Sequence, residues 1–447
     1  MNHKEPVIQV GILTSEKIEF VLNGIFIAQT GKDYSGYQSA AYNNGKILFD
    51  EKEYDELIFE PIKGETSFDL INVVIGINFH WERKEDQRFK GALRILPEEK
   101  NITAINRIGV EDYLTSVISS EMSATASDEL LKAHAVISRS WLLKPLHEQD
   151  SANHEPASPT ELNTVDPDSA IETHIKWYER DAHTHFDVCA DDHCQRYQGI
   201  TRATTKAVEK AIEATRGEVL MSGDEICDAR FSKSCGGVSE TFENCWAPKH
   251  YTYLSKVIDN PSAPEDFELD LTIEANADRW IRQSPEAFCN STDKKVLSQV
   301  LNNYDQETTD FYRWKVEYSQ SELSELLLRR SGIDFGYIVD LVPVKRGESG
   351  RLVELKIIGT KRTVIVGKEL EIRKWLSNSH LYSSAFVVDK LKIENNIPQQ
   401  FRLTGAGWGH GAGLCQIGAA VMGEKGYKYN DILMHYFRNS ELKKIYP

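Results

Sequence analysis

The sequence predicts an α+β fold, in which a β-rich N-terminal module packs with a helix-containing core around a cleft and the core carries an inserted α+β subdomain. Short alternating apolar segments fill residues 7–105, helical apolar spacing begins at residue 111, and residues 260–395 mix charged helical and strand-like segments. Apolar residues with a period of two are typical of strands, and apolar residues three or four apart are typical of helices. A chain of 447 residues also exceeds what one hydrophobic core usually organises, so we expect more than one domain.

The N-terminal module covers residues 1–105. Its segments VIQVGIL, KIEFVLNG, KILFD and ALRIL are short, rich in β-branched or aromatic residues, and separated by Gly, Asn and Asp. This pattern is typical of strands that are joined by tight turns. We expect a compact β-rich module.

Two helices joined by a short turn follow the module, and each carries one charged residue toward the core. In VEDYLTSVISSEM, Leu114, Ile118 and Glu121 fall on one helical stripe, so a glutamate continues the apolar face. The next helix starts after Ser127, a typical N-cap residue, and places Arg139 partly on its buried side. A buried Glu–Arg pair that fixes the packing of the helices explains this arrangement. A carboxyl group that donates a proton from an apolar setting explains it as well.

Local signals predict the next elements. Residues 146–176 are polar and contain proline, so we expect an exposed loop there. Residues 203–216 predict a helix that Gly217 caps, and residues 222–224 predict the turn of a hairpin. Residues 430–438 predict a closing helix.

The sequence becomes more charged and mixed after residue 259, and this change in composition divides the core into two parts. Residues 260–395 are charged and mixed, and we assign them to an inserted or accessory α+β subdomain. The core then consists of residues 106–259 and residues 396–447, where glycine-rich sequence returns.

One short segment, HTHFDVCADDHCQRYQG, is dense in potential metal ligands. These are His183, His185, Cys189, His193 and Cys194. Thiolate and imidazole together suit zinc, whereas free thiols beside surface histidines, or a disulfide, are the alternatives. A metal with an open position facing a cleft would indicate a zinc hydrolase, and a closed site would indicate a structural zinc. We favour a structural zinc that orders this loop.

Composition excludes several classes of partner. The formal net charge is −16, which argues against nucleic acid and anionic membrane surfaces, because both attract Lys and Arg.

No apolar run approaches the roughly 20 residues of a membrane span. The start, MNHKEPVIQV, lacks the apolar core of a signal peptide, so we expect a cytoplasmic protein, or one that reaches the cell envelope by another route. Seven cysteines, an odd number, do not form a complete disulfide framework.

The stretch TGAGWGHGAGLCQIGAA, residues 404–420, contains six glycines and no charged residue. A phosphate-binding loop would carry Lys and Ser or Thr after the glycines, and a flexible linker would not contain this much apolar sequence. Glycine lets the backbone approach a bulky ligand closely. Trp408 offers an apolar surface, while His410 and Gln416 offer uncharged hydrogen-bonding groups. These features favour binding of a sugar polymer. The alternative is that the glycines only form a tight turn beneath the active-site helices, and this structural role is compatible with binding.

Four segments together resemble one family. GVEDYLTSVISSEMSATASDELLKAHAVISRSWLL, DVCADDHCQRYQG, FSKSCGGVSETFENCW and GAGWGHGAGLCQIGA resemble, in order, the signatures of the stage II sporulation protein D (SpoIID/LytB) family. The resemblance covers about half of the chain. It implies a lytic transglycosylase that cleaves the MurNAc–GlcNAc bond of peptidoglycan and forms 1,6-anhydro-MurNAc, or alternatively a non-catalytic glycan-binding enhancer of a cell-wall amidase. The implied partners are peptidoglycan glycan strands or muropeptides, and an amidase.

The resemblance also assigns roles to individual residues. It implies that Glu121 is the general acid and base, with Arg139 as its catalytic neighbour. It implies that Cys189, Cys194 and His183 bind the metal, with His185 as the alternative histidine. The implied substrate-binding residues are His193, Ser234, Gly236, Gly237, Trp408, His410 and Gln416. The chain departs from the family pattern at His134, where glutamine is usual, and at Cys415, where serine is usual.

Overall fold

The structure is a computed structural model that describes residues 4–62, 64–75, 83–123, 125–150, 161–165, 171–178, 180, 183–191, 194–201, 204–300 and 310–447. Its contacts divide the chain into two compact units. The first unit consists of Met1–Ala124, Arg180–Glu218 and Lys444–Pro447, and the second of Thr125–Glu179 and Val219–Lys443. The units contain both helices and several sheets, which confirms the predicted α+β class. Among the described helices, none has the length and apolar character that a membrane span requires.

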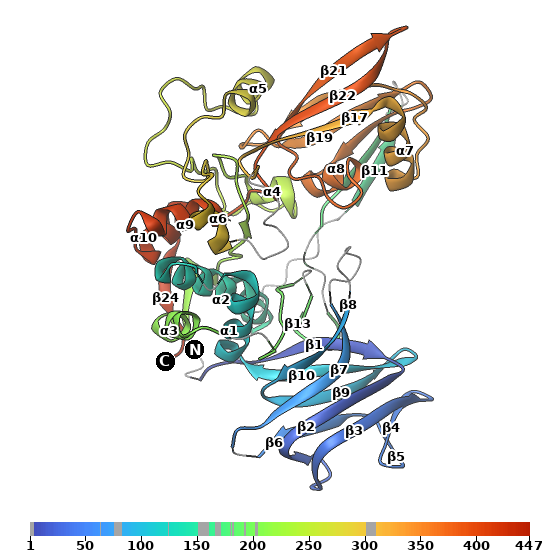
Figure 1. Ribbon diagram of the computed structural model, residues 1–447, viewed down its shortest axis with the longest axis vertical. Coiled ribbons are helices and arrows are strands. Elements are labelled where there is room, and N and C mark those ends of the chain that lie inside the picture. Colours follow the sequence, from blue (N-terminus) through green and yellow to red (C-terminus); the bar gives the residue numbers. More distant parts are fainter. Residues whose placement is uncertain are drawn as a thin grey trace. The chain divides into compact units, whose positions relative to one another are not determined.

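One large sheet dominates the first unit (Figure 1). Its strands are β1 (Val7–Ser15), β2 (Lys17–Ala28), β3 (Asp33–Asn43), β4 (Lys46–Phe49), β5 (Lys52–Tyr54), β6 (Leu57–Pro61), β7 (Ser67–Ile75), β8 (Arg83–Phe89), β9 (Ala92–Glu98), β10 (Asn101–Gly109) and β13 (Val188–Cys189). The order is β13-β1-β10-β9-β6-β2-β3-β4-β5, and β7 joins β2 to β8. The predicted N-terminal strands are therefore confirmed.

Strand β13 attaches a distant loop to this sheet. It runs parallel to β1, with Gly11 opposite Cys189. A side chain at Gly11 would collide with the ring of Phe186, because its Cβ would lie 2.5 Å from that ring. Glycine at this position therefore lets the loop that carries Cys189 lie directly against β1.

Two helices complete the first unit. These are α1 (Val110–Glu121), which follows β10 directly, and α3 (Lys206–Ala214), which packs on α1. Thr205 caps α3, because its side chain accepts a hydrogen bond from the amide of Val208. Gly217 has a φ of +72° just after the helix, as its predicted capping role requires. Both predicted helices are confirmed.

The second unit contains the remaining helices. They are α2 (Asp128–Asp150), α4 (Phe242–Cys245), α5 (Glu274–Gln283), α6 (Lys294–Val300), α7 (Gln320–Ser331), α8 (Glu369–Trp375), α9 (Gln416–Glu424) and α10 (Tyr429–Tyr436). Helices α9 and α10 pack on α2, and α6 packs on α9. Ser127 caps α2 through a hydrogen bond from the amide of Leu130 to its Oγ, 3.4 Å long. This confirms the predicted start of that helix.

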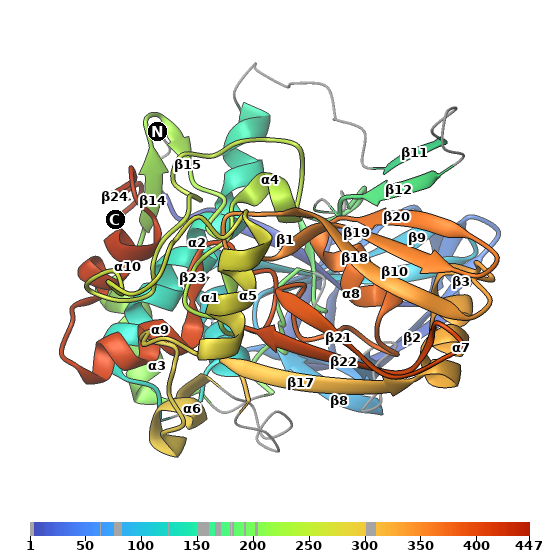
Figure 2. The same ribbon diagram turned by 90° about the horizontal axis from the view of Figure 1, so that it is seen from above.

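The second unit also contains several small sheets (Figure 2). A five-stranded sheet has the order β11 (Glu161–Val165), β12 (Glu172–Lys176), β20 (Thr363–Gly367), β19 (Leu352–Gly359) and β18 (Ile338–Arg346). A three-stranded sheet joins β17 (Arg313–Ser319), β22 (Ile397–Ala406) and β21 (Phe386–Glu394). Smaller pairings join β16 (Phe231–Ser232) to β23 (Leu414–Cys415), and β14 (Glu218–Ser222) to β15 (Glu225–Ile226) and β24 (Glu441–Lys444). The predicted hairpin at residues 222–224 is confirmed.

The segment predicted as an exposed loop, residues 146–176, contains regular structure. Helix α2 continues to Asp150, and two strands follow. Strand β12 pairs in parallel with β20, with Glu172 opposite Val364. The prediction was wrong there because the partner strand lies almost two hundred residues away in the sequence.

Candidate functional site

Glu121 is the last residue of α1 and lies in the first unit. Leu114, Val117 and Ile118 of the same helix are fully buried, and Glu121 is partly exposed. Met122 leaves the helical conformation at once, with φ −111° and ψ 149°. The structure therefore contains the predicted apolar stripe and places a carboxylate where it ends.

The predicted metal ligands His183, Cys189 and Cys194 come together in the first unit. Nε2 of His183 lies 3.2 Å from Sγ of Cys194. The three potential ligand atoms all lie within 4.8 Å of one another, whereas His185 is exposed and outside the group. His193 lies outside the described residues.

The donor set of this group fits zinc, which prefers cysteine sulfur and histidine nitrogen. In the protein alone, the hydrogen bond with Cys189 and burial raise the pKa of the Cys194 thiol. A bound cation would favour the deprotonated thiols, since the thiolate is the form that binds metal.

The loop that carries these ligands is fixed on α1. The amide of Gln198 donates to Oγ of Ser116, 3.2 Å away, and the ring of Tyr197 stacks on Tyr113 with centroids 4.9 Å apart. The hydroxyl of Tyr197 donates to Oδ1 of Asn106 at 2.6 Å. The helix that ends at Glu121 therefore also supports the loop of potential metal ligands.

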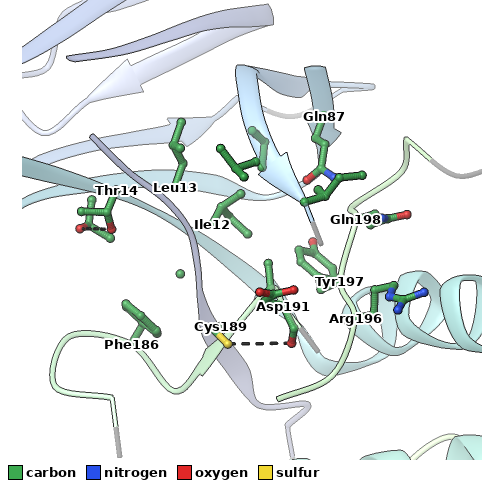
Figure 3. A pocket seen from close by; sticks show the side chains of 16 residues that line it. Ile12, Leu13, Thr14, Gln87, Phe186, Cys189, Asp191, Arg196, Tyr197 and Gln198 are labelled. Atoms are coloured by element: carbon green, nitrogen blue, oxygen red, sulfur yellow. Dashed lines mark hydrogen bonds between the residues drawn. The ribbon is translucent and has the colours of Figure 1, made fainter. Parts of the chain in front are cut away.

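A pocket of about 370 Å³ lies beside this loop in the first unit (Figure 3). Apolar residues of β1 and β7 form much of its wall, and Cys189 and Gln198 also line it. Gln87 is 1% exposed and lines the pocket as well, and its Oε1 has no hydrogen-bond partner among the described residues. The pocket therefore combines an apolar surface with a few polar groups, as ligand sites commonly do.

In the second unit, the SCGG segment and the glycine-rich stretch lie side by side. The amide of Ser234 donates to the carbonyl of Trp408 at 3.1 Å, and the amide of Trp408 donates to the carbonyl of Ser234 at 2.8 Å. Gly236 and Gly237 have φ values of +78° and +103°, which favour glycine. A Cβ at Gly237 would lie 2.7 Å from the ring of Trp280. Two motifs that are far apart in the sequence therefore form one backbone platform.

Alternate glycines shape the rest of this platform. Positive φ values between +75° and +96° occur at Gly407, Gly409, Gly411 and Gly413. Arg351, which sequence reasoning missed, packs against them and is only 1% exposed. Its Nη1 donates to the carbonyl of Cys235 at 3.0 Å, and its Nη2 donates to the carbonyl of Gly409 at 3.1 Å. No sequence signal marks Arg351, because it lies within the region assigned to the inserted subdomain.

Trp408 contributes a partly exposed aromatic ring to the platform. Phe311 and Tyr382 flank it, with ring centroids 4.7 Å and 4.4 Å away. Such an aromatic group can pack against the apolar face of a sugar while its surroundings supply hydrogen bonds.

His410 is partly buried, two positions after Trp408. Its Nδ1 accepts a hydrogen bond from the amide of Ala412 at 3.1 Å, and its ring meets Trp246 edge-on at 4.9 Å. Burial, together with the charges of Arg230 and Arg351, holds the pKa of His410 well below its usual value. The ring is therefore neutral at pH 7.

Three further polar side chains are buried in the second unit. Gln416 is buried at the start of α9, and its Nε2 lies 3.0 Å from Nε2 of His134 in α2. Burial and the charge of Lys233 lower the pKa of His134 to about 3. Arg139, also in α2, is fully buried. The predicted Gln416 therefore links two helices in this structure.

Comparison with known proteins relates these features to two domain families. The family "Stage II sporulation protein" matches residues 98–221, which include Glu121, Arg139 and the loop of potential metal ligands. A domain of unknown function, DUF8618, matches residues 240–413.

Three curated proteins are similar to most of the chain. The stage II sporulation protein D of Bacillus subtilis is 21% identical over 342 residues, which cover 76% of each chain. The amidase enhancer of Bacillus subtilis is 23% identical over 351 residues, which cover 74% of this chain and 40% of that protein. An uncharacterized protein of Brachyspira hyodysenteriae is 23% identical over 354 residues, which cover 79% of this chain and 72% of the relative.

Proposed function

We propose that this protein, a member of the stage II sporulation protein family, is a lytic transglycosylase that cleaves the MurNAc–GlcNAc bond of peptidoglycan. The position of Glu121 carries the proposal, since it ends the apolar stripe of α1 within the matched family domain. Glu121 is partly exposed, so a substrate can reach its carboxyl group, and donation of a proton by a positioned carboxyl group is what the reaction requires.

The reaction needs one carboxyl group. Glu121 donates its proton to the glycosidic oxygen, and the bond between that oxygen and the anomeric carbon of MurNAc breaks. The 6-hydroxyl of the same MurNAc attacks its own anomeric carbon and returns its proton to Glu121, which gives the 1,6-anhydro product. Hydrolytic glycosidases use a second carboxyl group to activate water or to attack the sugar, but here the nucleophile belongs to the substrate.

Other residues have supporting roles in this proposal. His183, Cys189 and Cys194 would hold a zinc ion, which would fix their loop on α1. Arg139 is fully buried, which supports a role in positioning α2 within the family motif.

The glycine-rich platform would bind the glycan strand or a muropeptide. Ser234, Gly236 and Gly237 form it together with the aromatic ring of Trp408. His410 and Gln416 stabilise its backbone and its junction with α2. His193, outside the described residues, stays a predicted substrate contact.

Mass spectrometry of peptidoglycan, with and without stem peptides, tests the proposal. We expect anhydro-muropeptides from the parent protein and a rate that is lower by about 10²–10⁴-fold with Glu121→Gln. Glu209→Gln, on the exposed face of α3, is the matched control and should leave the rate unchanged. Equal rates for the parent and Glu121→Gln would contradict the role of Glu121, and reducing-end products would indicate hydrolysis.

A second candidate function is enhancement of a cell-wall amidase by binding to glycan. The similarity to the amidase enhancer of Bacillus subtilis favours it. In that case neither the parent nor Glu121→Gln releases anhydro-muropeptides, and both stimulate an amidase to the same extent.

A further inference from the structure

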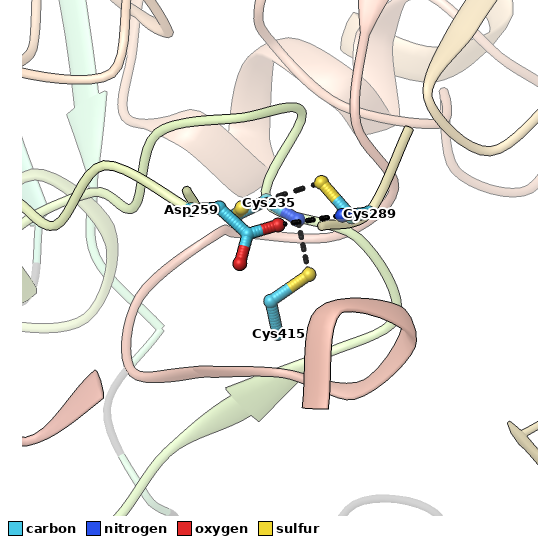
Figure 4. A group of neighbouring side chains, drawn as sticks. All are labelled: Cys235, Asp259, Cys289 and Cys415. Carbon is cyan, nitrogen blue, oxygen red and sulfur yellow. Dashed lines mark hydrogen bonds between the residues drawn. The ribbon is translucent and has the colours of Figure 1, made fainter. Parts of the chain in front are cut away.

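A second group of potential metal ligands lies in the second unit, outside the residues that carry the proposed function. It consists of Cys235, Asp259, Cys289 and Cys415, whose side chains converge (Figure 4). Cys235 belongs to the SCGG segment after β16, Cys289 lies between α5 and α6, and Cys415 directly precedes α9. Asp259 follows Ile258, which forms an isolated bridge with Val238. Four distant segments of the chain therefore meet at one point.

The distances suit a tetrahedral ion. Sγ of Cys235 and Sγ of Cys289 lie 3.7 Å apart, and the four potential ligand atoms all lie within 4.8 Å of one another. Two sulfur atoms that each lie about 2.3 Å from a tetrahedral zinc are about 3.8 Å apart. The observed separation of the two sulfur atoms is therefore that of two ligands on one zinc ion.

Burial and charge also favour a cation at this point. All four residues are at most 2% exposed. Among the described residues none forms an ion pair with Asp259, and the nearby Arg313 directs its donors to backbone carbonyls, including those of Trp280 and Ile281. A buried carboxylate without a paired cation is costly, so buried charges in proteins are paired or bind metals.

Hydrogen bonds orient the ligands. The hydroxyl of Tyr436 donates to Oδ1 of Asp259 at 2.6 Å, and the amide of Cys289 donates to Oδ2 at 2.8 Å. The amide of Cys235 donates to Sγ of Cys415 at 3.2 Å. Donors of this kind, directed at negatively charged ligands, are the usual second layer around a protein-bound metal.

We propose that the thiolates of Cys235, Cys289 and Cys415 and the carboxylate of Asp259 bind one structural zinc ion. Binding releases the protons that the thiols and the carboxyl group carry in the protein alone, and it fills all four positions, so no position is left for water or substrate. The ion joins the SCGG segment to the start of α9 across 180 residues of sequence. It thereby fixes both ends of the platform that carries Trp408.

A disulfide between Cys235 and Cys289 is the competing arrangement. It would require the two sulfur atoms to move from 3.7 Å to about 2.05 Å and an oxidant to accept two electrons. It would also leave Asp259 buried without a cation. The geometry therefore favours the metal.

Zinc analysis of the purified full-length protein tests the proposal. The first metal group is removed with His183→Ala and Cys189→Ser, so that any remaining zinc reports on the second group. In this background we expect about one zinc per chain. Adding Cys289→Ser should abolish it, whereas adding Cys227→Ser, a buried free thiol outside the group, should not.

Alkylation of the native protein, followed by peptide mass spectrometry, gives a test that does not depend on how a variant folds. We expect Cys235, Cys289 and Cys415 to be protected in the parent and to react after a zinc chelator is added. The proposal would be overturned if the variant with His183→Ala and Cys189→Ser contained no zinc. It would also be overturned if zinc persisted in that variant after Cys289→Ser was added. A disulfide-linked peptide pair that contains Cys235 and Cys289 would also overturn it.

Discussion

Replacing Arg351 with methionine tests whether the glycine-rich platform depends on one buried guanidinium group. Arg351→Met removes the donors to the buried carbonyl of Cys235 and the partly buried carbonyl of Gly409. A buried acceptor that loses its partner costs about 1–3 kcal/mol and a partly buried one costs less, so we expect about 3 kcal/mol for the two. For a unit of this size 1 kcal/mol lowers Tm by about 2 °C, so we expect a decrease of about 6 °C.

Differential scanning calorimetry measures this change on the transition of the second unit. Arg362→Met is the matched control, because Arg362 forms an exposed ion pair with Glu172, 3.3 Å long. Exposed ion pairs contribute about 0–1 kcal/mol, so we expect a decrease in Tm of at most about 2 °C. If both variants lowered Tm equally, the hydrogen bonds of Arg351 would not hold the platform together.

Two further predictions concern His134 and Trp408. The pKa of His134 is lowered to about 3 in the folded protein, below its usual value of 6.5, so the unfolded chain binds more protons between these pH values. The contribution of His134 to stability is therefore complete above about pH 6.5 and is lost as the pH falls toward 3. In urea unfolding between about pH 4 and 5.5, His134→Gln should reduce the slope of unfolding free energy against pH by about 1.4 kcal/mol per unit, and an unchanged slope would contradict this. Trp408→Ala should weaken binding to purified glycan strands about tenfold in a sedimentation assay, with Trp408→Phe near the parent, and equal binding by all three would exclude Trp408 as a contact.

Much of the fold could be predicted because its signals are local. The apolar stripe of α1 consists of apolar residues that lie three and four positions apart in the sequence. The N-cap of α2 is a single serine directly before the helix. His183, Cys189 and Cys194 lie within twelve residues, so their ligand chemistry shows in a short segment. Residue spacing also placed Glu121 in line with the apolar stripe of α1, and the structure leaves this end of the stripe partly exposed.

Other features depended on packing between distant segments. The pairing of β12 with β20 and the hydrogen bonds of Arg351 join residues that no local pattern connects. The same holds for Cys235 and Cys415, which are 180 positions apart.

The sequence by itself determined the α+β class, the helix that carries Glu121 and the first group of potential metal ligands. Only the tertiary structure decided that Arg351 supports the glycine-rich platform and that Cys235, Asp259, Cys289 and Cys415 meet. The physical reason is that periodicity shows which face of an element is apolar, but not which distant segment covers it.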